Sequence, residues 1–238
     1  MNRAPVRDVG VVIVAAGRGT RTAGEELKQF RWVAGKPMLL HSLQTFMRRS
    51  DVAMVVCVLP REFAGDPPPW IFQCDTDRLL VAAGGRARGD SVLAGLEDLP
   101  AEVTIVLVHD AARPFVDDAT IGRVIDAART GEGAVAALPL SDTLKRANEA
   151  GRVVETAPRD ALWRAQTPQG FPRAMIERAY REARLDGVQA TDDAALCERL
   201  GLPVHVVAGS ARAFKITDEE DFARADALSP APSPPRPT

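Results

Sequence analysis

The chain has 238 residues, and its 30 Lys and Arg against 32 Asp and Glu give a formal net charge of -2. Hydrophobic residues make up 46% and charged residues 26%, as in an ordinary globular chain, so we expect one large domain. The charge excludes bulk attraction to nucleic acid or acidic membranes, and 5% aromatic residues are too few for a base-stacking surface. Three widely spaced cysteines (Cys57, Cys74 and Cys197) form no CxxC pair and predict neither a disulfide framework nor a zinc site.

Signals for export or membrane insertion are missing from the sequence pattern. The N-terminal residues lead straight into a strand-like stretch without a cleavage-site pattern. No apolar run approaches the roughly 20 residues that a membrane-spanning helix needs. We therefore expect a cytoplasmic protein that binds neither membranes nor nucleic acid.

Short β-branched apolar runs alternate along the chain with segments of helical period. The runs are nearly continuous, which is typical of strands buried on both faces of a parallel sheet. The strand-like runs are Val9–Ala15, Val52–Leu59, Leu79–Ala82, Val103–Val108, Ala134–Leu138 and Val204–Val207. The helix-like segments are Pro37–Arg49, Ser91–Leu99 with Ser91 as expected N-cap, Asp117–Arg129, Pro172–Leu185 and Asp192–Leu200. This alternation predicts an α/β, Rossmann-like fold with a doubly wound, mostly parallel sheet.

Two stretches depart from that alternation. Ser141–Ala157 contains two strand-like runs around Asn148–Gly151, which predicts a β-hairpin projecting from the core at about residues 140–158. The pattern fits both a dimerisation arm and a plain surface hairpin. Residues 229–238 are rich in Pro and Ser and are expected to be disordered, which leaves a domain over residues 7–228.

The segment from Val11 to Lys28 joins a strand to a glycine loop that carries its own cations. Gly17 and Gly19 allow a phosphate to approach main-chain N–H groups closely, and Arg21 and Lys28 follow. The loop lacks the GK[ST] of a Walker A motif and the third glycine of a dinucleotide fingerprint. Backbone donors combined with cations suit a triphosphate. The alternative for so short a motif is an ordinary turn with solvated charges.

Further motifs identify a family. The AAGxGxR pattern followed by a lysine is similar to that of sugar and alditol nucleotidyltransferases. The other segments are GGRARGDSVLAGL (84–96), VLVHDAARP (106–114), LPLSDTLK (138–145), ALWRAQTPQGF (161–171), TDDA (191–194) and AFKIT (213–217). Together they resemble the 2-C-methyl-D-erythritol 4-phosphate cytidylyltransferase family, in the right order from about Val9 to Asp226. The combination of HDAARP, TPQ and FKIT is far more specific than the glycine loop.

The resemblance implies transfer of a cytidylyl group from CTP to 2-C-methyl-D-erythritol 4-phosphate, with release of pyrophosphate, in non-mevalonate isoprenoid precursor synthesis. Because the attacking phosphate is already anionic, no general base is needed, and catalysis depends on positioning and on charge neutralisation. The resemblance implies that Arg21 and Lys28 supply that neutralisation. It also implies a homodimer, and Mg²⁺ or another divalent cation held mainly by the CTP phosphates with Asp110 as a protein ligand.

The same resemblance assigns the binding residues. Those expected to bind CTP are Ala15, Ala16, Gly17, Gly19, Gly85 and Ser91. Those expected to bind the methylerythritol phosphate are Asp110, Arg113, Thr143, Arg159, Thr167, Thr191 and Lys215. Thr143 and Arg159 lie on or next to the hairpin, which implies that they act on the neighbouring subunit's site. His109 is expected to be a hydrogen-bonded strand-end histidine rather than a proton shuttle.

Simpler structural roles stay open for several of these residues. Gly84 and Gly85 fit a strand-to-loop turn, Ser91 fits a helix N-cap, and Lys215 fits a solvated charge. Asp110 and Arg113 fit a buried ion pair that serves the fold alone.

Four positions depart from the family pattern. Val14 and Leu27 stand where proline is usual, Arg86 where an acidic residue is common, and Asp193 where many members have glutamate. None of these changes removes a catalytic charge, but they put loop order and the nucleotide contacts in question.

Two other functions stay open, a ribitol 5-phosphate cytidylyltransferase and a non-catalytic nucleotide-binding dimer. The presence of both Arg21 and Lys28 favours an enzyme. Some relatives carry a fused cyclodiphosphate synthase domain, and the proline-rich tail leads us to expect no such activity in this chain.

Overall fold

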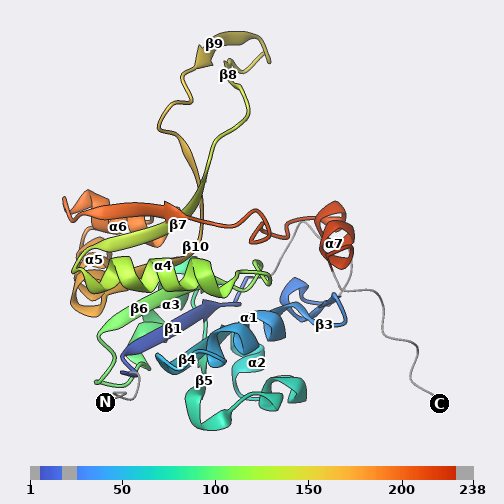
Figure 1. The fold of residues 1–238 in the computed structure, drawn as a ribbon, viewed down its shortest axis with the longest axis vertical. Coiled ribbons are helices and arrows are strands. Elements are labelled where there is room, and N and C mark those ends of the chain that lie inside the picture. The colour runs from blue at the N-terminus through green and yellow to red at the C-terminus, as the bar shows by residue number, and fades with distance from the viewer. Residues whose placement is uncertain (1–5, 18–25, 229–238) are drawn as a thin grey trace.

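The computed structural model describes residues 6–17 and 26–228 (Figure 1). Gly19, Arg21 and the tail at 229–238 therefore lie outside the described residues. A seven-stranded sheet with the order β11-β7-β10-β6-β1-β4-β5 forms the centre of the molecule. Its strands are β1 (Val9–Val14), β4 (Val52–Leu59), β5 (Leu79–Ala83), β6 (Ile105–Asp110), β7 (Gly133–Pro139), β10 (Trp163–Pro172) and β11 (Val204–Ala208).

The sheet confirms the predicted mostly parallel α/β fold and adds one strand. The neighbours β6, β1, β4 and β5 pair in parallel, as do β7 and β11. The unpredicted strand β10 runs antiparallel between β6 and β7. Its polar residues Gln166, Thr167 and Gln169 and its internal Pro168 conceal the apolar signal of a central strand.

Helices cover both faces of this sheet. The longer ones are α1 (Met38–Met47), α3 (Arg88–Glu97), α4 (Asp118–Arg129), α5 (Arg173–Leu185), α6 (Asp193–Arg199) and α7 (Glu219–Asp226), and α2 (Arg61–Ala64) is a single turn. Short 3-10 helices occupy Lys28–Phe30, Pro69–Gln73 and Thr76–Arg78, and a small hairpin pairs β2 (Trp32–Val33) with β3 (Lys36–Pro37). Within the described ranges, no helix has the length and apolar character that a membrane span requires.

The five predicted helices are confirmed, but the expected cap of α3 is wrong. The helix begins at Arg88 with Ala87 as N-cap, so Ser91 lies inside its first turns. The Asp90 carboxylate accepts a hydrogen bond from the Ala87 N–H at 3.0 Å. This capping interaction lies at Ala87, four residues before the expected N-cap Ser91. Helix α7 was not predicted, because its short sequence buries only Phe222 and Ala225.

Strand β1 shows why the apolar runs are continuous. Val9, Val11 and Ile13 are buried in one cluster with residues of α1 and α4, whereas Val12 is buried in a second cluster with residues of α3, α5 and α6. Successive side chains of a strand point to opposite faces, so a strand covered on both sides must be apolar throughout. In a strand such as β1, polar groups are thereby left to the residues that follow its end.

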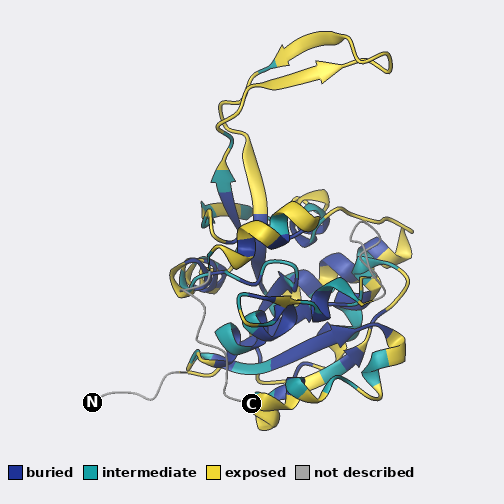
Figure 2. Cartoon of the chain, turned by 90° about the vertical axis from the view of Figure 1, so that its right-hand side faces the viewer, coloured by how far each residue is buried: buried dark blue, intermediate teal, exposed yellow. Residues whose placement is uncertain are grey.

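An arm projects from the body between β7 and β10 (Figure 1). Near its tip, β8 (Leu144–Ala147) pairs antiparallel with β9 (Val153–Ala157). Asn148 Oδ1 accepts hydrogen bonds from the Ala150 and Arg152 N–H groups, and Gly151 adopts a φ of 75°. Figure 2 shows the arm as almost wholly exposed.

The contact between α3 and β1 can be tested with a matched pair of helical glycines. A Cβ at Gly95 would lie 2.4 Å from Val12 Cγ1 in the core, whereas a Cβ at Gly122 in α4 would meet no heavy atom within 4 Å. We expect Gly95→Ala to lower the free energy of unfolding by about 1–3 kcal/mol through overpacking. Gly122→Ala should raise it by about 0.5–1 kcal/mol through helix propensity. Urea denaturation measures both, and an unaltered Gly95→Ala protein would contradict this packing.

Candidate active site at the carboxyl edge of the sheet

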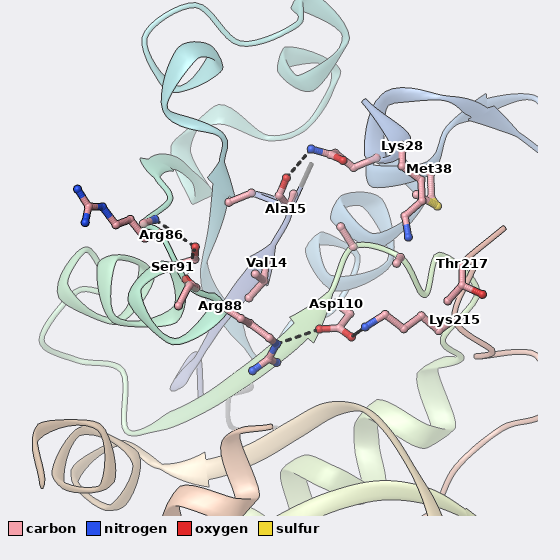
Figure 3. Close-up of a pocket in the computed structure, with 17 residues that line it drawn as sticks. Val14, Ala15, Lys28, Met38, Arg86, Arg88, Ser91, Asp110, Lys215 and Thr217 are labelled. Carbon is pink, nitrogen blue, oxygen red and sulfur yellow. Dashed lines mark hydrogen bonds and ion pairs between the residues drawn. The ribbon is translucent and has the colours of Figure 1, made fainter. Parts of the chain in front are cut away.

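A cavity of about 330 Å³ opens where β1, β5 and β6 end (Figure 3). Ligands of open α/β folds bind beyond the carboxyl ends of the strands, and this cavity has that location. Its lining comes from four places: residues 14–17 at the end of β1, residues 85–88 and Ser91 around the start of α3, residues 110–112 at the end of β6, and a group formed by Lys28, Gln29, Met38, Lys215 and Thr217.

One wall of the cavity is built from two glycine-containing loops in close contact. A Cβ at Gly84 would lie 2.2 Å from the Ala16 Cβ, so only glycine allows this approach. The Gly85 N–H donates to Ser91 Oγ at 3.2 Å, and the Ser91 hydroxyl lies 3.3 Å from the Ala87 carbonyl that it donates to. The structure thus brings Ser91 and Gly85 together with residues 15–17, as the sequence predicted, with Ser91 bracing the loop instead of capping the helix.

The opposite wall carries charge. Lys28 Nζ donates to the Ile216 carbonyl at 2.8 Å, and Lys215 Nζ lies 2.8 Å from Asp110 Oδ2. Arg88 Nε lies 3.4 Å from Asp110 Oδ1 (Figure 3). Burial raises the pKa of Asp110, but the charges of Arg88 and Lys215 lower it more, so the pKa lies below its ordinary range and the carboxylate stays ionised at neutral pH.

Asp110 is the single carboxylate among the described residues that line the cavity. The described part of the chain contains no cluster of three or more His, Cys, Asp and Glu side chains that could hold a metal ion. Mg²⁺ requires six oxygen ligands, and one carboxylate supplies few of them. The donor set therefore fits a cation that arrives on a phosphate ligand better than one held in a protein cage.

Behind Asp110 lies a buried hydrogen-bonded group. Thr167 Oγ1 accepts from the Asp110 N–H at 3.0 Å and lies 3.1 Å from His109 Nδ1, and His109 Nε2 lies 3.1 Å from the Arg113 carbonyl. His109 is fully buried, and both ring nitrogens have partners, as expected for a structural histidine. Thr167, predicted to bind substrate, is also buried and supports the backbone of Asp110 instead of lining the cavity.

Arg113 lies beside this group without a carboxylate partner in the described chain. Its Nη1 donates to the Ala213 carbonyl at 2.9 Å and its Nη2 to the Ala165 carbonyl at 3.3 Å. The alternative of a structural Asp110–Arg113 ion pair is wrong, because Asp110 pairs with Arg88 and Lys215. The guanidinium is half-buried and its hydrogen bonds go to neutral carbonyls, so a carboxylate at longer range, Asp110, compensates its charge only in part, which favours binding of an anion nearby.

The remaining predicted residues lie away from the cavity. Thr143 and Arg159 are exposed on the arm, where Arg159 Nη1 donates to the Ser141 carbonyl. Thr191 is exposed just before α6. Sequence reasoning missed Arg88 as a cavity residue, although it stands within the quoted segment at 84–96, because no local pattern reveals the partner of a long side chain.

His109 provides a test of the buried group. Burial lowers the pKa of His109 from 6.5 to about 4. Between about pH 6.5 and pH 4 the imidazole is therefore protonated in the unfolded chain but neutral in the folded one. The free energy of unfolding falls as pH drops through this range, by up to roughly 3 kcal/mol near pH 4. We expect the NMR signals of the His109 ring to stay unshifted between about pH 8 and pH 5. A midpoint near the ordinary value would contradict the burial of this ring.

Comparisons with known proteins show the family to which this fold belongs. The family described as IspD, 2-C-methyl-D-erythritol 4-phosphate cytidylyltransferase, matches residues 9–229. A protein of that name from Syntrophus aciditrophicus is 40% identical over 223 residues, which cover 92% of this chain and 95% of the relative. The crystal structure of the enzyme of that name from Thermus thermophilus is 39% identical, with a TM-score of 0.77, and the match covers 93% of this chain and 98% of that one.

Other relatives are longer. The bifunctional enzyme IspD/IspF of Solidesulfovibrio magneticus is 44% identical over 235 residues, or 95% of this chain but 58% of that protein. The chain spans a little more than half the length of such bifunctional relatives and nearly the whole length of the shorter ones. On the extent of these matches, the chain belongs to the 2-C-methyl-D-erythritol 4-phosphate cytidylyltransferase family.

Proposed function

We propose that this protein transfers a cytidylyl group from CTP to 2-C-methyl-D-erythritol 4-phosphate, giving 4-diphosphocytidyl-2-C-methyl-D-erythritol and pyrophosphate. The observation that carries the proposal is the cavity at the carboxyl edge of the sheet, where two glycine loops face Lys28 and Lys215 across a single ionised carboxylate, Asp110. Its membership of the family supports the choice of substrates.

The described residues fit a reaction without a general base. An oxygen of the acceptor phosphate attacks the α-phosphorus of CTP, and the bond from that phosphorus to the bridging oxygen of pyrophosphate breaks. The acceptor is already anionic, so no proton has to be removed. Asp110 is held ionised between cations, and His109 is buried behind it. Catalysis then depends on alignment and on neutralising charge at the α-phosphate.

We assign the neutralising role to Lys28 together with Arg21, which lies outside the described residues. A divalent cation carried on the triphosphate would add positive charge at the phosphate oxygens, and Asp110, the one carboxylate among the described lining residues, would be its protein ligand. Arg113, Lys215 and Thr191 are proposed to receive the acceptor, since cations and a hydroxyl donor suit a phosphate monoester.

The arm is proposed to form a homodimer in which it reaches the partner's cavity. Val153 and Val154, 61% and 59% exposed, and Trp163, 47% exposed, present apolar surface. An isolated two-stranded hairpin is marginally stable in water, so packing against a second chain would stabilise it. Arg159 follows β9 on the arm, which projects from the body (Figure 1), and it is not among the residues that line its own chain's cavity, which supports a role in the neighbouring site.

The activity itself is tested by pyrophosphate release with Mg²⁺ and CTP, comparing methylerythritol 4-phosphate with ribitol 5-phosphate. We expect turnover with the tetritol alone. Turnover with ribitol phosphate would move the protein to a different reaction that uses the same cavity. Release with neither acceptor, despite measurable CTP binding, would favour the non-catalytic nucleotide-binding dimer.

Lys28→Ala should lower kcat by about 10²–10³-fold, the scale for a donor that stabilises developing charge. Lys36→Ala is a matched control, because Lys36 donates to Gln44 Oε1 at 2.5 Å and lies outside the cavity lining. Steady-state assays of both variants make the comparison. Equal activity of the two variants would contradict the proposed catalytic role of Lys28.

Mixing two inactive variants tests the action of the arm on the partner. Lys28→Ala and Arg159→Ala homodimers should each have little activity, but a mixed dimer has one site with both residues intact. Random exchange of subunits should therefore restore about a quarter of the wild-type activity. If the mixture stays inactive although mass spectrometry of differently tagged chains shows mixed dimers, Arg159 does not act across the interface.

A further inference from the structure

Asp193, the first residue of α6, holds an arginine from behind the cavity. Its side chain has no solvent exposure. Arg88 Nη1 donates to Asp193 Oδ1 at 2.9 Å and Arg88 Nη2 to Asp193 Oδ2 at 2.7 Å, which is a bidentate pair. The Tyr180 hydroxyl donates to Oδ1 at 2.5 Å. Both oxygens of this buried carboxylate therefore accept hydrogen bonds, two at Oδ1 and one at Oδ2.

The remaining nitrogen of the same guanidinium faces the cavity. Arg88 Nε lies 3.4 Å from Asp110 Oδ1, and Asp110 Oδ2 lies 2.8 Å from Lys215 Nζ (Figure 3). The exposed fraction of the side chain rises from zero at Asp193 to 14% at Asp110 and 42% at Lys215. Asp193, Arg88, Asp110 and Lys215 thus form a row of alternating charges that leads from the buried start of α6 to the cavity.

Arg88 occupies a place that does not favour a cation on local grounds. It is the first residue of α3, where the positive end of the helix dipole repels positive charge. Burial lowers the pKa of Arg88, but the charge of Asp193 and its hydrogen bonds raise it more, so the guanidinium stays charged. The two carboxylates account for its position.

Asp193 is itself rigidly placed. The N–H groups of Asp193 and Ala194 both donate to Gln169 Oε1, at 3.1 and 2.9 Å, and Gln169 Nε2 donates to Asp192 Oδ2 at 2.8 Å. Gln169 belongs to β10, which pairs with β6, the strand whose last residue is Asp110. The backbone of Asp193 is therefore fixed to the sheet independently of the contact between its carboxylate and Arg88.

From this geometry we infer that Arg88 is a positioning residue for Asp110, and that Asp193 acts through Arg88. The buried carboxylate fixes the guanidinium, which in turn holds the Asp110 carboxylate at the cavity opposite Lys215. Because Thr191 precedes Asp193 closely, this connection also ties the acceptor-side segment 191–194 to the nucleotide-side segment 85–91. The inference rests on the proposed function for its effect on turnover, but not for its geometry.

Two variants of the same buried cluster separate positioning from stability. Asp193→Asn removes the charge that holds Arg88, and we expect kcat to fall by about 10²-fold, as for a small misplacement of a reacting site. The Kd of CTP, measured by calorimetry, should change by less than about threefold, because the loss concerns alignment. Tyr180→Phe removes one hydrogen bond from the same carboxylate and leaves the ion pair, so kcat should stay within about twofold. Both variants should lower the Tm of thermal unfolding.

A double-mutant cycle tests whether Asp193 acts through Arg88. Adding Asp193→Asn to Arg88→Gln should lower kcat no further if the two residues act as one unit. Independent, multiplying effects would overturn the inference, as would an Asp193→Asn protein that is less stable but turns over at the wild-type rate. If Asp193→Asn does not fold, Arg88→Lys replaces it, since a single ammonium cannot bond both oxygens of Asp193 and still reach Asp110.

A crystal structure of the Asp193→Asn or Arg88→Lys protein gives a readout that needs no activity. We expect the side chain at position 88 to leave Asp110 in either variant, and an unaltered contact would overturn the inference. An inactive wild-type protein would contradict the proposed function alone, since the displacement can still be measured.

Discussion

Burial of the central sheet on both faces is the constraint on which the site depends. Side chains of β1 alternate between two apolar clusters, and β6 does the same from Ile105 to Val108. A charged group inside such a strand would lose its hydration without a partner. Chemistry is therefore confined to the residues just beyond the strands, and the parallel arrangement brings the ends of β1, β5 and β6 to one edge.

Charge at that edge is arranged so that one carboxylate serves several cations. Asp110 contacts Arg88 on one oxygen and Lys215 on the other, and Arg88 has its own buried partner in Asp193. Lys28 donates to the Ile216 carbonyl. Among the described residues that line the cavity, Lys28, Arg86, Arg88 and Lys215 are cations and Asp110 is the one carboxylate, a balance that suits a polyphosphate and its anionic acceptor.

The departures from the family pattern have structural readings. Leu27 stands where proline is usual, yet its φ of -61° is the value that proline would impose, so the backbone conformation is kept without the ring. Val14 lines the cavity at the end of β1. The side chain of Arg86 points away from Asp110 and Lys28 in Figure 3, so its charge is directed outward. Asp193 keeps the carboxylate of the usual glutamate, and this carboxylate forms an ion pair with Arg88.

The sequence by itself determined the six apolar strands of the central sheet, the main helices, the position of the arm and the loops around the cavity, because apolar period and glycine placement act over a few residues. Tertiary structure alone decided that the polar segment at 163–172 enters the sheet as β10, and that Thr167 supports Asp110 from behind. It also decided that Ser91 braces a loop, and that Arg88 joins Asp193 to Asp110. Such partners lie far apart along the chain, and the burial that makes their pairing favourable exists only once the sheet and helices have packed together.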